Sequence, residues 1–335
     1  MNVVLIIPTG IDCEIGGDAG DAAPVAKLIG SCCDRLITNP NVVNASDINE
    51  MPPNTWYVEG SILDRFLEKK CALKKPFINK ILVVVNKKDY QSINAISAAR
   101  MSLGIDAEIL QLDTPLQLIA TMANGLASGD VYGWEELCKQ VSNYEFDALA
   151  IATPITIAEE TIIKYFKEGG INPVGKVEAI ASRLIADKIC KPVAHGPVDY
   201  AMEGFKEVVD PRKAVEIITE NFIHCVLKGL HQAPRIVRFD DYSQERILRV
   251  HDIDIMISPM GCFGRPHQAC LDRNIPIMVV RENKTVLNDF EDNDPRFIFV
   301  DNYIEAAGRL QCLKAGVHYP TVRRPVEWTK EANRS

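Results

Sequence analysis

The sequence predicts an α/β fold of mostly parallel sheets with helices on both faces, in a Rossmann-like arrangement. Apolar runs of strand length alternate with amphipathic helical segments along almost all of the 335 residues, and this alternation is typical of parallel strands joined by helical crossovers. The stretch 252–281 contains one complete strand–helix–strand unit. An apolar content of 47% with 24% charged residues is ordinary for a globular protein.

Strands are expected where short runs rich in valine and isoleucine end at turn-forming residues. They span 3–8, 35–38, 56–59, 81–86, 107–112, 148–153, 192–195, 236–239, 253–257, 275–280 and 297–300. Helices are expected where apolar residues recur every three to four positions. Gly104 ends one of them and Pro266 opens another, each in the position that its residue type favours. The remaining expected helices span 21–33, 61–70, 115–127, 134–141, 158–168, 177–187, 211–230 and 304–313.

One internal echo bears on the domain organisation. Residues 147–154 and 252–259 share the form D-x5-[S/T]-P, and a helical segment follows each of them. Two strand ends of the same design favour two related lobes around a cleft, although buried strands also end on a hydroxyl and a proline by chance. We expect an N-terminal lobe at 1–145, a C-terminal lobe at 146–318 and a tail at 319–335.

Composition excludes several classes of function. The net charge of −8 without a long basic run argues against a nucleic-acid partner. No apolar run reaches the roughly 18–20 residues of a membrane span, and the first residues have no signal-peptide pattern. The ten cysteines include no C-x-x-C pair, so we expect free thiols, no structural zinc site and a cytoplasmic protein. A homo-oligomer is compatible with these features.

The loop after residue 257 is the first candidate site. Glycines flank Cys262 immediately before a helix, whose N-terminus favours a thiolate. We predict Cys262 as a nucleophile or base, with His267 as an acid/base partner and Arg281 as a carboxylate clamp. The alternative is a buried cysteine that fills a tight corner. The other predicted ligand contacts of this corner are Ser258, Gly261 and Gly264.

The loop after the first strand is the second candidate site. It holds four glycines and four carboxylates between positions 10 and 21. Glycines let a backbone approach a ligand closely, and carboxylates suit a cation, an amine or a sugar hydroxyl. The predicted substrate contacts are Thr9, Gly10, Gly17, Asp18 and Asp21, and the last two are the predicted Mg²⁺ ligands if a metal binds. The alternative is that Asp21 caps a helix and the glycines form a turn.

Three further strand or helix ends carry polar groups. Asn39 and Asn41 follow the second strand and are predicted substrate contacts, or Asx turns. Thr153 ends one strand, and His195 ends another, where an acid/base histidine is well placed near neutral pH. The Gly-bounded loop 169–178, with Lys176 at a helix start, suits an anion or is a surface connection.

Two resemblances add to these interpretations. Residues 261–264 (G-C-F-G), followed by a helix and then Ile-Pro-Ile, resemble the second-cysteine segment of the aspartate/glutamate racemase superfamily. That family delivers one cysteine from each half to opposite faces of a small acid. Here the echoing strand end offers Thr153, so a second cysteine would have to be Cys13. Over nearly the whole chain, PTGI, EIGG, AGDA, LDTPLQLIATM and NPVG resemble an uncharacterised family of photosynthetic bacteria and plants, a domain of unknown function, which implies no activity.

The favoured hypothesis is an enzyme that acts on a small polar or anionic metabolite as an isomerase or racemase, a lyase or a hydrolase. Its predicted catalytic residues are Cys262, His195 and His267, and it requires no cofactor. One alternative is a nucleotide- or cofactor-binding protein that uses Asp18 and Asp21 with Mg²⁺. Another is a non-catalytic assembly factor, which would present an apolar surface groove.

Overall fold

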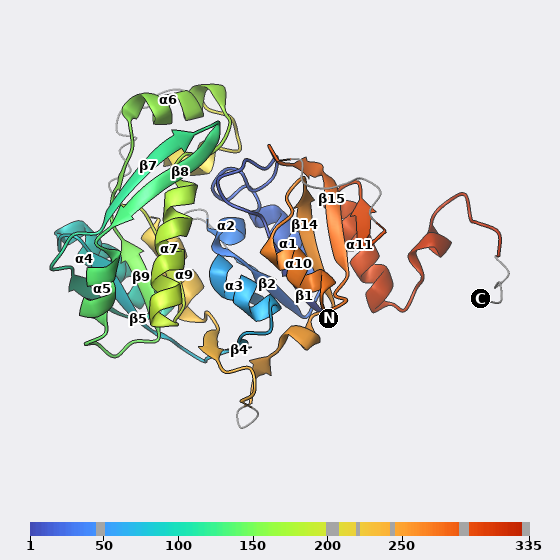
Figure 1. Ribbon diagram of the computed structural model, residues 1–335, viewed down its shortest axis with the longest axis horizontal. Coiled ribbons are helices and arrows are strands. Elements are labelled where there is room, and N and C mark those ends of the chain that lie inside the picture. Colours follow the sequence, from blue (N-terminus) through green and yellow to red (C-terminus); the bar gives the residue numbers. More distant parts are fainter. Residues whose placement is uncertain (45–50, 199–207, 219–221, 242–244, 288–294, 330–335) are drawn as a thin grey trace.

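The computed structural model confirms the α/β class and describes residues 1–44, 51–198, 208–218, 222–241, 245–287 and 295–329. Two parallel sheets form the body of the protein, and helices cover their faces (Figure 1). Within the described residues, none of the helices is both long and apolar enough to cross a membrane.

The larger sheet has six strands, all parallel, in the order β16-β15-β14-β1-β2-β3. Its strands are β1 (Asn2–Leu5), β2 (Arg35–Thr38), β3 (Thr55–Tyr57), β14 (Ile255–Met260), β15 (Ile277–Lys284) and β16 (Phe297–Val300). Read along the chain, the strand order runs outward in one direction from β1 and then outward in the other from β14. Such a reversal creates a crevice at the carboxyl ends of the two central strands, where doubly wound folds bind ligands.

The second parallel sheet has four strands in the order β11-β9-β5-β6. They are β5 (Lys80–Val85), β6 (Asp106–Gln111), β9 (Ala148–Ala152) and β11 (Val193–His195). The residues are nearly all apolar and buried in β5 and β9, as strands covered on both faces require.

The two parallel sheets do not take their strands from separate halves of the chain. The six-stranded sheet takes strands from both ends of the chain, before residue 58 and after residue 254. The expected boundary at residue 145 falls inside the four-stranded sheet, between β6 and β9. The chain therefore starts in one sheet, builds the other and returns, because β14 pairs with β1 and not with the strands that precede it.

One expected helix is wrong. Residues 115–127 contain β7 (Gln117–Ala123) and the start of β8 (Leu126–Tyr132), which form an antiparallel hairpin. Asn124 and Gly125 connect them with φ values of 53° and 77°. Asn-Gly with both residues in the left-handed region is the preferred two-residue hairpin turn. The apolar spacing suggested a helix, but this turn signal decides the structure. β10 (Ile155–Thr156) pairs with β7.

The other connections are mostly helical, together with a small antiparallel sheet of β12 (Arg235–Val237), β4 (Ala72–Lys74) and β13 (Ile247–Leu248). The expected helix 211–230 lies partly outside the described residues, which show α8 and α9 there. The α-helices are α1 (Ala23–Ser31), α2 (Pro40–Val43), α3 (Gly60–Leu67), α4 (Tyr90–Leu103), α5 (Trp134–Val141), α6 (Glu159–Glu168), α7 (Gly175–Ile189), α8 (Ala214–Ile218), α9 (Ile223–His231), α10 (Arg265–Leu271) and α11 (Tyr303–Lys314).

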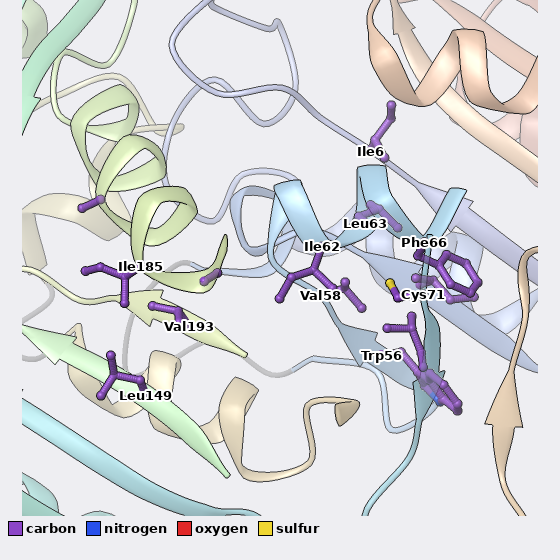
Figure 2. Close-up of a cluster of buried hydrophobic side chains, with 14 of the residues drawn as sticks. Ile6, Trp56, Val58, Ile62, Leu63, Phe66, Cys71, Leu149, Ile185 and Val193 are labelled. Carbon is purple, nitrogen blue, oxygen red and sulfur yellow. The ribbon is translucent and has the colours of Figure 1, made fainter. Parts of the chain in front are cut away.

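A hydrophobic cluster that contains side chains of both parallel sheets joins them (Figure 2). Trp56 of β3 contributes from the six-stranded sheet, and Leu149 of β9 contributes from the four-stranded sheet. Ile62 and Phe66 of α3 and Ile185 of α7 fill the space between them. Because the same side chains bury both sheets, the loops at the facing sheet edges are held in fixed relation. All ten cysteines are free thiols, and eight of them are buried.

Candidate functional site

A pocket of about 170 Å³ lies between the two parallel sheets, at the carboxyl ends of their strands. Its first wall consists of the loops that follow β1, β2 and β3 and includes Thr9, Gly10 and Gly17. Its second wall is the first turns of α7 and the end of β11, with Glu178 and His195. Ligand sites of open α/β sheets occupy this edge.

The walls meet where the loop after β1 packs on the start of α7. Gly10 has a φ of 79°, and a Cβ there would lie 2.9 Å from Cβ of Lys176. A Cβ added to Gly175 would lie 3.0 Å from the methyl group of Thr9. Glycines at both positions allow this close approach. Lys176, a predicted anion ligand, therefore packs with its side-chain stem against Gly10.

The asparagines after β2 hold the same loop. The Asn39 side chain accepts from the backbone N–H of Ile7 at 3.3 Å and donates to its carbonyl at 3.0 Å. The Asn41 amide donates to the carbonyls of Pro8 and Gly16 at 3.1 and 3.2 Å. Both asparagines also line the pocket, so they shape its wall by fixing the backbone of the β1 loop.

Glu178, His195 and Thr153 form a connected set at the second wall. Nδ1 of His195 lies 2.8 Å from Oε1 of Glu178. Nε2 lies 3.1 Å from the hydroxyl of Thr153 and 3.0 Å from its backbone carbonyl. The His195 side chain is fully buried, while that of Glu178 is 25% exposed and lines the pocket. Within this set, Glu178 therefore contacts solvent and His195 supports it.

The contacts of His195 allow two arrangements of its ring hydrogens. If Nε2 donates to the Thr153 carbonyl at 3.0 Å, a further hydrogen lies between Nδ1 and Glu178. If Nε2 accepts from the Thr153 hydroxyl at 3.1 Å, the hydrogen of the neutral ring lies on Nδ1 and is donated to Glu178. In both arrangements a hydrogen lies between the imidazole and a carboxyl group that lines the pocket, and it can pass through Glu178 to a group there.

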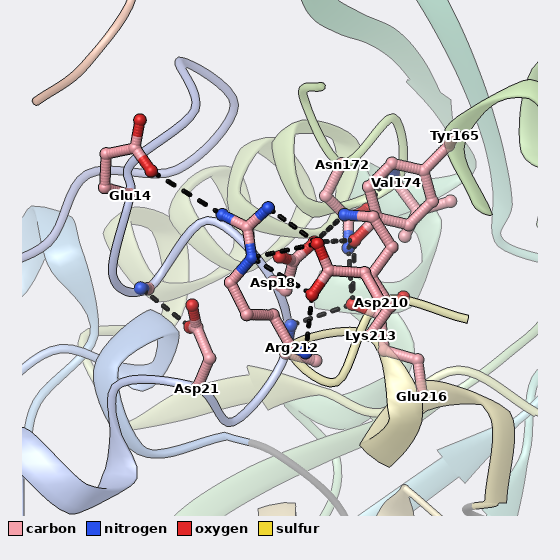
Figure 3. Close-up of polar contacts among 12 residues, drawn as sticks. Glu14, Asp18, Asp21, Tyr165, Asn172, Val174, Asp210, Arg212, Lys213 and Glu216 are labelled. Atoms are coloured by element: carbon pink, nitrogen blue, oxygen red, sulfur yellow. Dashed lines mark hydrogen bonds and ion pairs between the residues drawn. The ribbon is translucent and has the colours of Figure 1, made fainter. Parts of the chain in front are cut away.

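A buried polar network lies beside the pocket (Figure 3). Asp18 forms an ion pair with Lys213, and the two side chains are 5% and 2% exposed. The Lys213 ammonium also lies 4.1 Å from the centre of the Tyr165 ring. Glu216 accepts hydrogen bonds from the amide of Asn172 at 2.9 Å and from the backbone N–H of Ala19 at 2.8 Å. The network thus joins the loop after β1 to α6, to the loop before α7 and to α8.

Burial changes the acidity of several carboxyl groups here. It raises the pKa of Glu216 to about 7 against the effect of its hydrogen-bond donors, and the charge of Asp18 adds to the increase. Burial and Asp18 likewise raise the pKa of Asp21 to about 7, although the backbone N–H of Gly16 donates to Asp21 at 2.7 Å. The pKa of Asp12 is raised for the same two main reasons.

These contacts bear on the predicted metal ligands. The Asp18 carboxylate already has Lys213 as its counter-ion, and Asp21 holds the turn at Gly16. Among the described residues, no group of three or more histidine, cysteine, aspartate or glutamate side chains is arranged to hold a metal ion. A Mg²⁺ site at Asp18 and Asp21 stays a prediction, and Lys213 would compete with the metal ion for the Asp18 carboxylate.

The Cys262 corner lies apart from this pocket. Ser258, two residues before the last residue of β14, contacts Nε2 of His267 at 2.7 Å, and the backbone N–H of Gly264 donates to Nδ1 at 3.2 Å. Nδ1 therefore carries no proton, and burial lowers the pKa of His267 to about 4. A neutral His267 fixes the corner. A role as the acid/base partner of Cys262 stays a prediction, and it would need Gly264 to release Nδ1.

Cys262 is 5% exposed, and its thiol donates to the Pro259 carbonyl at 3.4 Å. Burial raises the pKa of the Cys13 thiol, and the charge of Cys262 raises it further. The racemase-like pairing of Cys13 with Cys262 stays a prediction. Both thiols are buried, and neither belongs to the described lining of the pocket.

The predicted site residues therefore fall into two groups. The described lining of the pocket includes six of them and leaves the other nine outside. The six are Thr9, Gly10, Gly17, Asn39, Asn41 and His195. Among the nine, Thr153 reaches the pocket through His195, and Arg281 stacks 4.4 Å from the centre of the Phe299 ring. The remaining seven are Asp18, Asp21, Ser258, Gly261, Cys262, Gly264 and His267.

Sequence reasoning missed Glu178, Asn172 and Glu216. A signal for Glu178 was present. A helix that follows one parallel strand begins at the carboxyl edge of the sheet, and the next parallel strand ends at that edge. The first turn of α7 and the last residue of β11 must therefore be neighbours.

Comparison with known proteins places the chain in a family. Residues 2–323 match the family described as protein of unknown function (DUF3326). A protein of Synechococcus sp. named an uncharacterized lipoprotein is 32% identical over 332 residues, which cover 94% of this chain and 91% of that protein. No solved structure is significantly similar to the chain. The predicted resemblance to an uncharacterised family is confirmed, and the chain belongs to the DUF3326 family of proteins of unknown function.

Proposed function

We propose that the pocket between the two sheets binds a small neutral or cationic metabolite and that Glu178 exchanges a proton with it. The protein would then be a proton-transfer enzyme of the isomerase, racemase or lyase kind. The observation that carries the proposal is the contact of 2.8 Å between Nδ1 of His195 and the carboxyl group of Glu178. This contact keeps a transferable proton beside a carboxyl group that lines a pocket.

The size and charge of the pocket support a particular class of ligand. A volume of about 170 Å³ is below the ~300–1,000 Å³ of drug-sized ligand sites. The described lining includes the carboxyl groups of Asp12, Glu59, Glu178 and Glu216 and no lysine or arginine. Apart from the imidazole of His195, an anionic ligand would meet mainly carboxyl groups in this lining. The proposal thus narrows the predicted polar or anionic metabolite to a neutral or cationic one.

The roles within the site follow from the contacts. Glu178 is the acid or base that reaches the ligand, and His195 is a positioning residue that holds the carboxyl group and balances its charge. Thr153 fixes the histidine ring through two contacts. Asn172 and the loop at Thr9 complete the wall. Proton transfer by a positioned carboxyl group typically increases a reaction rate by about 10²–10⁴-fold.

Proton exchange in D₂O tests this proposal without a known reaction. Small aldoses, amino sugars, amines and amino acids are incubated with the protein, and the loss of individual C–H signals is followed by ¹H NMR. We expect exchange on at least one compound, about 100-fold slower with Glu178→Gln. Glu135→Gln, an exposed glutamate in the first turn of α5, is the control and should match the wild type. Undiminished exchange with Glu178→Gln would overturn the assignment.

The same assay distinguishes catalysis by Glu178 from catalysis by Cys262. Because Cys262 is outside the described lining of the pocket, Cys262→Ala should keep the exchange rate within about threefold of the wild type. A loss with Cys262→Ala and retention with Glu178→Gln would transfer the chemistry to the cysteine corner. The nucleotide-binding alternative predicts instead a rise in melting temperature on addition of ATP with Mg²⁺, which Asp18→Asn would abolish.

A further inference from the structure

Glu59 is a buried carboxyl group in the first wall of the pocket, and the proposed proton transfer does not use it. It follows β3 and is the N-cap residue of α3. The residue is 6% exposed and belongs to the described lining of the pocket. A buried carboxyl group needs partners that replace its lost hydration. The partners of Glu59 therefore indicate what this wall of the pocket can bind.

Only one oxygen of this carboxyl group is used by the described residues. The backbone N–H groups of Ser61 and Ile62 donate to Oε2 of Glu59 at 2.9 and 3.2 Å, and the Ser61 hydroxyl donates to the same oxygen. Among the described residues, no hydrogen bond reaches the other oxygen, Oε1. Oε1 is not sealed inside the protein, so it is open to a ligand in the pocket.

The carboxyl groups of the lining differ in their cationic neighbours. Three of them have one: Glu178 lies beside His195, and Asp12 and Glu216 lie in the field of Lys213. No ion pair involves Glu59 among the described residues. Arg65 of α3 pairs with Asp187 at 3.6 Å, and the charge that acts most on Glu59 is the negative one of Asp187. Burial also raises the pKa of Glu59, which is the cost of a charge without a counter-ion.

We propose that Oε1 of Glu59 binds a primary ammonium group of the ligand, so that the metabolite is a small amine cation. An ammonium group donates a charge-assisted hydrogen bond to Oε1 and also supplies the missing counter-ion. A hydroxyl group would make the hydrogen bond but leave the charge uncompensated. The inference rests on the proposed function, because it places the ligand in the same pocket, and it narrows the neutral or cationic metabolite to a cationic one.

The position of Glu59 along α7 sets the form of this ligand. The Ser61 hydroxyl lies 3.2 Å from Oδ1 of Asp187, so Glu59 is near the last turns of α7, whereas Glu178 is in its first turn. The nine residues between Glu178 and Asp187 span about 13 Å of helix. Ser182 lies between them, and it lines the pocket. A ligand that reaches both carboxyl groups therefore carries its ammonium group several bonds from the carbon that exchanges its hydrogen.

Isothermal titration calorimetry with matched compounds tests the ammonium site at Glu59. The probes are 1,4-diaminobutane and 4-aminobutan-1-ol against 1,4-butanediol, and 6-amino-6-deoxyglucose against glucose. We expect at least one amine to bind the wild type at least about tenfold more tightly than its hydroxyl counterpart. Glu59→Gln should remove this preference, and Glu135→Gln, an exposed glutamate, should keep it. A wild type that binds no amine in preference, or a Glu59→Gln variant that still does, overturns the proposal.

A second variant separates the charge of Glu59 from its structural role. Glu59→Gln keeps an oxygen for the N–H groups at the start of α3, and urea titration checks that it folds. Glu59→Asp keeps the charge and is a favourable N-cap residue, so it should retain a preference for the amine. A loss as complete as that with Glu59→Gln would overturn recognition by charge.

The exchange assay in D₂O separates the ammonium site from the proposed proton transfer. A wild type that prefers amines through Glu59 but exchanges no C–H hydrogen would support the ammonium site and overturn only the proton transfer. Exchange on neutral compounds without any preference for amines would overturn the ammonium site and leave the role of Glu178 in place.

Discussion

The carboxyl group of Glu178 lies 2.8 Å from Nδ1 of His195, although 17 residues separate them along the chain. The contact arises because α7 begins, and β11 ends, at the same edge of the four-stranded sheet. The same logic acts in the six-stranded sheet, where Ser258 contacts His267 at 2.7 Å. The two echoing strand ends, Thr153 and Ser258, therefore each hold a histidine. His195 contacts Glu178, whose carboxyl group lines the pocket. His267 is buried and does not belong to the described lining of that pocket.

Thr153→Val should affect both stability and proton exchange. It removes the hydroxyl 3.1 Å from Nε2 of His195 but leaves the backbone carbonyl, so we expect a loss of about 1 kcal/mol in the free energy of unfolding. A looser ring should lower the exchange rate about tenfold. Urea titration and the D₂O assay measure the two effects. Thr153→Ser restores the hydroxyl and should rescue both.

Ser258→Ala is the matched change at the echoing position. It removes the hydroxyl 2.7 Å from the buried Nε2 of His267 and should cost about 1–3 kcal/mol in urea titration. Because this histidine lies outside the described lining of the pocket, the exchange rate should not change. If Ser258→Ala abolished exchange and Thr153→Val did not, the active site would lie near Ser258 and His267 and not near Thr153 and His195.

Glu216→Gln should change the pH dependence of stability. Burial raises the pKa of Glu216 to about 7, against about 4.3 in an unfolded chain. Between these values the native state holds a proton that the unfolded state has released, so this group lowers stability as pH rises. The loss between pH 4.5 and 7.5 should be on the order of 3 kcal/mol. Urea titrations across this range should show a flatter profile for Glu216→Gln.

His267 acts in the opposite direction over the same range. Its pKa is lowered to about 4 by burial, so the unfolded state binds the extra proton between pH 4 and 6.5 and stability falls as pH falls. The comparison of Glu216→Gln with the wild type at each pH cancels this contribution. Glu135→Gln, an exposed glutamate, should reproduce the wild-type profile. A parallel profile for Glu216→Gln would contradict the raised pKa.

Lys213→Met should be strongly destabilising by itself. Lys213 and Asp18 are an ion pair with side chains 2% and 5% exposed, and loss of one partner leaves a buried charge, at a cost of about 3–5 kcal/mol. The double variant Asp18→Asn/Lys213→Met should recover at least half of this loss in urea titration. Lys80→Met removes an exposed pair with Glu108 and should cost at most about 1 kcal/mol. Additive effects of the two buried substitutions would contradict a direct interaction.

Gly261→Ala should distort the Cys262 corner. Gly261 has a φ of 86°, and a Cβ there would lie 2.4 Å from the Leu287 carbonyl oxygen. Since a backbone atom cannot easily move aside, we expect a loss above about 2 kcal/mol in thermal or urea unfolding. Gly264→Ala is the control. Its φ is −158°, and the nearest atom to an added Cβ is 3.7 Å away, so it should cost less than about 1 kcal/mol. Equal effects of the two substitutions would refute this geometry.

The local pattern of apolar residues and turn-forming residues was sufficient to predict most of the strands and helices. Apolar runs such as 81–85 and 148–152 are buried strands because valine, isoleucine and alanine fill a sheet covered on both faces. The pattern failed at 115–127, where the helical spacing of apolar residues competed with the Asn124-Gly125 turn. Two residues with positive φ fix a hairpin more strongly than apolar spacing fixes a helix.

For the candidate site, too, local sequence determines one part and tertiary packing determines the other. The sequence by itself determined that polar groups such as Thr9, Asn39 and His195 stand at the ends of buried strands, because parallel strands in an α/β protein deliver their last residues to one edge. It did not determine which of these ends face each other. Only the tertiary structure decided that Glu178 meets His195 in the wall of a pocket, while Cys262 is buried outside the described lining of that pocket. The reason is physical: periodicity and turn chemistry act within a few residues, whereas the pairing of β1 with β14 and the shared core between the sheets depend on packing of segments up to about 250 residues apart.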